Sequence, residues 1–200
     1  MMNVTRRVLP GFLFAASALA AAVLVPPPVS GQAQKESFTG FAINMNSGPS
    51  TAVVDFTIER WSTDAERASL LNILKEVKDS YRANEQMLKA LQKMPKTGSI
   101  RTPERLAWDL HYARQSPLDE GGRRIVLATD RPIGFREARV QAETMDYPFT
   151  IIEVQLDKDD KGVGKILAGT RLYIDKKSGE VVLENYAQQP VRFNEIHRLK

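Results

Sequence analysis

The chain has 200 residues, no cysteine, and 28 basic against 24 acidic residues, which gives a net charge of +4. Without cysteine there are no disulfides, no cysteine-ligated metals and no lipid anchor on an N-terminal cysteine. Acidic and basic residues are interspersed, and no basic run is interleaved with aromatic residues, so we expect no nucleic-acid binding. The length suits one domain.

The N-terminal segment predicts export. Arg6 and Arg7 precede an uncharged apolar run over 11–25, and three prolines and a small-residue stretch follow. This is the pattern of a removable signal peptide. The run is shorter than the roughly 20 residues of a membrane-spanning helix; an uncleaved anchor and twin-arginine export are the alternatives. We therefore predict a signal peptide over 1–33 and one domain over 34–200, periplasmic or secreted, with no stable membrane span after cleavage.

The predicted domain opens with a β-hairpin. Residues 38–45 and 51–61 have the composition of strands, and the turn-forming residues 46–50 separate them. Polar and apolar residues alternate in the second strand, as they do in a strand buried on one face. Its predicted inner residues are Val54, Phe56 and Ile58.

Two helices follow the hairpin. Thr63 and Glu66 have the spacing of a capping box, which predicts a helix from there to about Tyr81. Asn84 is the predicted cap of a second helix, which Pro95 ends. Apolar residues recur at helical spacing, and their predicted role is core packing. The inner residues are Leu70, Leu74, Val77 and Tyr81 in the first helix, and Met87, Leu88, Leu91 and Met94 in the second.

The rest of the chain is predicted to be mostly β. Strands are expected at 106–112, 123–129, 148–156, 163–174, 180–186 and 191–197, and residues 133–146 are ambiguous. Short turns between consecutive strands favour an antiparallel meander. The predicted fold class is α+β: an antiparallel meander of about eight strands, as a curved sheet or partly closed barrel, with two helices inserted after the first hairpin.

Two residues are weak catalytic candidates. Asp109 and His111 are two apart on a predicted strand and share a face, and an aspartate can orient a histidine as a general base. No G-x-S-x-G nucleophile motif accompanies them, and a polar outer strand face is the alternative. The other histidine, His197, is too distant in sequence to suggest a zinc site. No dinucleotide or phosphate-loop motif is present, so no cofactor is predicted.

The acidic segment 157–162 raises the question of calcium. An EF-hand loop needs oxygen ligands at positions 1, 3 and 5 and a glutamate at position 12. Here Lys161 occupies position 5 and Ala168 occupies position 12. We predict a hairpin turn in which Gly162 supplies the positive φ angle, and no metal site.

Four aromatic residues are weak candidates for ligand contacts, because a curved sheet covered by helices often encloses an apolar pocket. Core packing is the alternative for each of them. They are Trp108, Tyr112, Phe149 and Tyr173.

Three segments, Arg123–Ile133, Met145–Thr150 and Glu184–Pro190, resemble a group of uncharacterised exported bacterial proteins. No activity, cofactor or catalytic residue is established for that group. The resemblance implies a bacterial source and a periplasmic or secreted location.

The residues favour a non-catalytic exported domain that binds a small apolar ligand or an envelope partner. A hydrolase with scattered acid and base residues is the first alternative, because carboxylates that meet only in the fold are invisible in sequence. A surface or assembly protein is the second. The sequence predicts no oligomeric state.

Overall fold

The computed structural model divides the chain into two units, residues 1–31 and 32–200, and every described residue belongs to the second. The predicted signal peptide lies outside the described residues. The structure describes residues 35–44, 50–77, 79–102, 106–119, 121–131, 133, 149–168, 170–174, 181–185 and 191–200.

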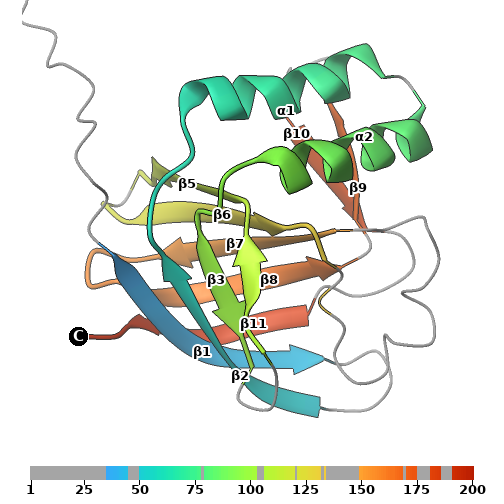
Figure 1. The fold of residues 1–200 in the computed structure, drawn as a ribbon. Coiled ribbons are helices and arrows are strands. Elements are labelled where there is room, and N and C mark those ends of the chain that lie inside the picture. The colour runs from blue at the N-terminus through green and yellow to red at the C-terminus, as the bar shows by residue number, and fades with distance from the viewer. Residues whose placement is uncertain are drawn as a thin grey trace, which may run out of the picture. The chain divides into compact units, whose positions relative to one another are not determined.

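Residues 32–200 form an α+β fold, as predicted, with one large antiparallel sheet (Figure 1). The helices are α1 (Asp64–Glu76) and α2 (Ser80–Lys93). The strands are β1 (Glu36–Asn44), β2 (Ser50–Ile58), β3 (Gly98–Arg101), β4 (Trp108–Leu110), β5 (Tyr112–Pro117), β6 (Arg123–Thr129), β7 (Thr150–Leu156), β8 (Lys161–Ala168), β9 (Thr170–Ile174), β10 (Val181–Asn185) and β11 (Val191–Arg198).

The large sheet has nine strands in the order β4-β3-β2-β1-β11-β8-β7-β6-β5. Its two edge strands, β4 and β5, are consecutive in the chain and only His111 separates them. The backbone of Leu110 pairs with Thr97 beside β3, whereas the amide of His111 donates to Ala128 in β6. One continuous segment therefore joins both edges, and the sheet is a nearly closed barrel. The described residues contain eleven strands against about eight predicted, because the sequence does not predict β3 or β5 and merges β8 with β9.

The bend at His111 also changes which side chains face inward. Leu110 and Ala113 are both fully buried inside the barrel, although they are three residues apart. Two successive residues, His111 and Tyr112, therefore face outward, as in a β-bulge. Simple alternation along the predicted strand 106–112 would place Tyr112 on the face of Trp108 and Leu110, but Tyr112 packs in the outer cluster under the helices instead.

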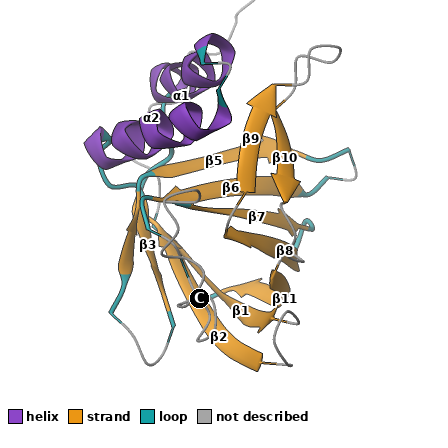
Figure 2. Ribbon diagram, turned by 90° about the vertical axis from the view of Figure 1, so that its right-hand side faces the viewer, coloured by secondary structure: helices purple, strands orange, loops and turns teal. Residues whose placement is uncertain are grey.

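The main core lies inside the barrel, and a second core lies between its outer face and α2. Predicted inner residues Val54, Phe56 and Ile58 of β2 are buried, as expected. The outer cluster joins Met87 and Leu91 of α2 to residues of β6, β7 and β8. Figure 2 shows the helices side by side next to β5 and β6, with the β9–β10 hairpin alongside.

The helix boundaries differ from the prediction. The capping box at Thr63 and Glu66 is confirmed, but α1 ends at Glu76 and Asp79, not Asn84, caps α2. Tyr81 therefore belongs to α2. No residue of α1 is fully buried, so its apolar stripe is only partly covered by the rest of the protein. Neither helix in the described part of the chain has the length and apolar character that a membrane crossing requires.

The predicted long strand 163–174 is two strands. Its first part, β8, belongs to the barrel, whereas β9 pairs with β10 in a separate two-stranded sheet. The strand predicted at 123–129 is confirmed to the residue. Most of the ambiguous segment 133–146 lies outside the described residues.

Candidate functional site

The barrel has two chemically different ends, and we name them after the first and last residues of β6. The Arg123 end contains large apolar side chains. Phe38 stacks on Phe56 with ring centroids 4.8 Å apart, and Phe193 meets Phe56 edge-on at 6.0 Å. Phe193 fits because Gly40 has no side chain: a Cβ atom there would lie 2.7 Å from the Phe193 ring. The interior is filled at this end.

Charged side chains close the Arg123 end above the rings. Arg123 lies 5.6 Å from the centroid of Phe38. Its guanidinium donates to Glu36 at 2.6 Å and to Asp160 at 2.7 Å, and Arg198 pairs with the other Asp160 oxygen at 3.3 Å. Burial alone would lower the pKa of Arg123, but the hydrogen bonds that it donates to its two carboxylate partners outweigh burial, and the pKa is raised. Each charge has a partner, as buried ions require.

The Thr129 end is lined by smaller and more polar side chains. The strand register places Thr129 opposite Thr150 and Ala42 opposite Ala52. Trp108 and Ala52 pack against the barrel core but remain partly exposed. The described inward residues towards this end include Asn44, Ala52, Trp108, Thr129, Thr150 and Val191, and Ile133 packs in the barrel core beside Thr150. None of them is charged.

Thr129 is the unusual residue of that end. Its side chain is fully buried, and Oγ1 has no hydrogen-bond partner among the described residues. The neighbouring Thr150 hydroxyl differs, because it accepts a hydrogen bond from the amide of Ile133 at 2.8 Å. Buried hydroxyl groups nearly always have a partner, since leaving one unpaired costs about 1–3 kcal/mol. We therefore take the Thr129 end as the candidate site.

The catalytic candidates Asp109 and His111 do not form a pair with each other. Asp109 is bound to Lys96 at 2.8 Å, and this hydrogen bond raises the pKa of Lys96. The Nδ1 atom of His111 lies 3.0 Å from the Met94 carbonyl, and Nε2 lies 3.5 Å from Asp130. His111 therefore lies between Met94, the C-cap residue of α2, and Asp130, which follows β6.

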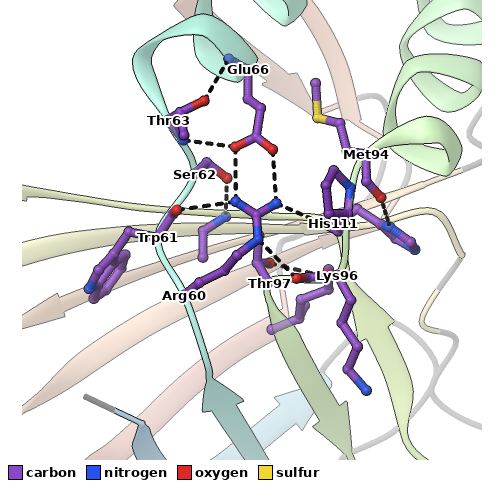
Figure 3. Close-up of polar contacts among 12 residues, drawn as sticks. Arg60, Trp61, Ser62, Thr63, Glu66, Met94, Lys96, Thr97 and His111 are labelled. Carbon is purple, nitrogen blue, oxygen red and sulfur yellow. Dashed lines mark hydrogen bonds and ion pairs between the residues drawn. The ribbon is translucent and has the colours of Figure 1, made fainter. Parts of the chain in front are cut away.

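Figure 3 shows that His111 belongs to a larger joint between helices and barrel. The Arg60 guanidinium makes two hydrogen bonds to Glu66, at 2.8 and 3.1 Å, and also donates to the carbonyls of Pro95 and Lys96. The hydrogen bond from Arg60 is the main cause of a lowered pKa for Glu66, and the Thr63 amide adds to it. The start of α1 and the end of α2 are thereby fixed to one side chain, so the joint has a structural role.

The four aromatic candidates lie in three places. Trp108 is inside the barrel near the Thr129 end, whereas Tyr112 and Phe149 pack in the outer cluster under α2. Tyr173 lies in β9, opposite Val182 of β10. Of the four, only Trp108 is placed at the candidate site.

The acidic turn binds the protein's own groups. Asp157 Oδ1 accepts from the amides of Asp159 and Lys161, and Asp160 binds arginine. Asp160 has a φ of 57° and supplies the positive φ angle of the turn. The prediction that Gly162 supplies it is wrong: Gly162 lies in β8, where a Cβ atom would collide with the Gln155 carbonyl. No group of three or more metal-ligating side chains is found in the described part of the chain.

Sequence reasoning missed both ends of β6. Arg123 reads as a strand start, and its carboxylate partners are 37 and 87 residues away. Thr129 reads as an ordinary strand residue, because only the register shows that its hydroxyl faces inward. The one available signal is a threonine that continues the inward phase of Ile125 and Leu127.

Comparison with known protein families, curated proteins and solved structures finds no match to this chain.

Proposed function

We propose that the protein is a non-catalytic domain that binds a small apolar ligand at the Thr129 end of its barrel. The observation that carries the proposal is the fully buried Thr129 hydroxyl, which has no hydrogen-bond partner among the described residues. Ligand sites typically combine an apolar lining with a few polar groups that orient the ligand. The Arg123 end is filled by aromatic rings and closed by ion pairs. We therefore propose no ligand-binding role for that end.

A hydrolase has less support. General-base catalysis needs a base that can reach the substrate proton, but the ring nitrogens of His111 face Met94 and Asp130. Its side chain is 14% exposed. The carboxylate of Asp109 is held by Lys96. These contacts favour a joint over a catalytic pair.

An envelope partner is the second candidate, and a different surface favours it. Phe41 is 40% exposed on the outer face of β1 and lies opposite Val53 of β2. Figure 1 shows β1 and β2 on the side of the barrel away from α1 and α2. Exposed apolar groups on such a face are typical of interaction surfaces when they form a patch.

Export is part of the proposal and rests on the N-terminal sequence pattern. We expect the mature protein to begin between Gln32 and Lys35 when a bacterial host exports it. N-terminal sequencing of the exported protein measures this directly. A chain that still begins at Met1 or Met2 would contradict it.

Native mass spectrometry of the exported protein tests the ligand. We expect a bound small molecule in the wild type. Ala52→Leu, which enlarges a side chain packed against the barrel core, should abolish it, whereas Val53→Leu on the outer face should retain it. Circular dichroism checks that both variants are folded. A wild type without any bound molecule, or a bound molecule that survives in folded Ala52→Leu, would contradict the proposal.

A further inference from the structure

We propose that the Thr129 hydroxyl is the polar anchor of the ligand, and that the ligand is a small uncharged molecule carrying a hydroxyl or carbonyl group. This inference rests on the proposed function and specifies the chemistry of its site. It concerns one atom, Thr129 Oγ1, and the uncharged side chains around it.

The first argument is the hydrogen-bonding capacity of Thr129. A threonine hydroxyl offers one donor and two acceptor positions, and all of them are unused among the described residues. Valine has nearly the same shape and would avoid the cost of an unpaired buried hydroxyl. We infer that a threonine at this position serves a polar group that the described residues do not provide.

The second argument is charge. The inward residues described at the Thr129 end are uncharged, whereas the buried ions of the barrel pair with each other at the Arg123 end. Asp130, next to Thr129, lies 3.5 Å from Nε2 of His111. An ionised ligand buried there would meet no counter-charge among the described inward residues, and a buried charge without a partner is strongly unfavourable. The site therefore favours neutral alcohols, ketones and esters over carboxylates and amines.

The third argument is size. Directly beyond Thr129 and Thr150, the next inward layer contains Leu127, Ile152 and Ile166, which are at most 1% exposed. This packed layer limits how far a ligand can reach towards the Arg123 end. Trp108 packs partly buried against the barrel core, so we choose its fluorescence to report occupancy.

The binding experiment uses the full chain carrying Trp61→Phe, which leaves Trp108 as its one tryptophan. Hexanol and hexanoate, titrated separately at neutral pH, are the probes, because they have equal chain length and differ in charge. We expect hexanol to change Trp108 fluorescence saturably and hexanoate to bind at least about tenfold more weakly, since a buried charge without a partner is costly.

Three variants in the same background test the anchor. Thr129→Val removes the hydroxyl and should weaken hexanol about three- to tenfold, the factor that one neutral hydrogen bond contributes. Its melting temperature should stay equal or rise, because an unpaired buried group is removed. Thr129→Ser keeps the hydroxyl and should bind like the wild type. Thr39→Val, on the outer face of β1, is the matched control and should leave hexanol binding unchanged.

The outcomes separate this inference from the proposed function. Equal hexanol affinity in Thr129→Val and wild type would overturn the anchor while the ligand proposal stands. Tighter binding of hexanoate than of hexanol would overturn the neutral ligand class. A lower melting temperature in Thr129→Val, or a crystal structure with saturating hexanol in which an internal water still binds Thr129 Oγ1, would assign the hydroxyl a structural role. A native wild type that carries no co-purifying molecule would contradict the proposed function itself.

Discussion

The two ends of β6 differ in how the buried polar group at each end is hydrogen-bonded. At Arg123 a buried charge is surrounded by two carboxylates and an aromatic ring, so its hydrogen bonds are provided within the chain. At Thr129 a buried hydroxyl has no partner in the described residues. The Arg123 end is thus closed by its own ion pairs. The Thr129 end is where we propose that a ligand binds.

The largest expected difference between the ends is in tolerance of volume changes. Phe56→Ala, at the filled Arg123 end, should lower the free energy of unfolding by about 3–5 kcal/mol, the range for large-to-small core substitutions. Ala52→Val, at the Thr129 end, should cost less than about 1 kcal/mol, because Ala52 is only partly buried. Urea unfolding with matched slopes measures both. Equal costs would show that the two ends are packed alike.

Gly162→Val should destabilise the Arg123 end by about 3 kcal/mol, at the upper end of the cost of overpacking. A Cβ atom at Gly162 would collide with the Gln155 carbonyl, and backbone cannot move aside as a side chain can. Asp159→Ala, three residues earlier in the exposed turn, is the control and should change stability by no more than about 0.5 kcal/mol. Thermal unfolding that is affected more by the control would refute this account of the hairpin.

Arg123→Met should cost about 2–3 kcal/mol, because Glu36 and Asp160 would keep partly buried negative charges after losing their main partner. Solvent screening reduces the effect, since these side chains are not fully buried. Arg124→Met removes an outer-face ion pair with Glu153 and should cost less than about 1 kcal/mol. Chemical denaturation measures the free energy of unfolding of both variants. Equal losses would show that the Arg123 ion pairs stabilise the protein no more than an ordinary surface ion pair does.

The smallest predicted effect is pH-dependent. Hydrogen bonds from the amides of Lys161 and Asp159 lower the pKa of Asp157 below its usual value near 3.8. The stabilisation from this carboxylate is therefore fully present above that value and is lost as the pH falls through the lowered folded-state pKa. Asp157→Asn should reduce the difference in urea midpoint between about pH 6 and about pH 3. An unchanged difference would mean that the turn is not stabilised by the charged form.

Local patterns predict much of this fold and little of its site. The capping box at Thr63 and the bounds of β6 follow from short-range chemistry, and both are confirmed. The partner of His111 could not be predicted, because a β-bulge at the barrel seam turns its ring towards Met94 and Asp130. The role of Thr129 depends on which strands lie beside β6, which no local signal encodes.

The pairing of β1 with β11 has a consequence for folding. Phe38 lies opposite Arg198, so the barrel closes between segments near opposite ends of the described chain. Contacts of such large sequence separation form slowly, because the loop entropy is lost before the contact is gained. Until residues 191–198 are added, β1 and β8 have unpaired edges that can recruit other chains. Truncation before Val191 should therefore yield an aggregating protein and not a smaller stable barrel.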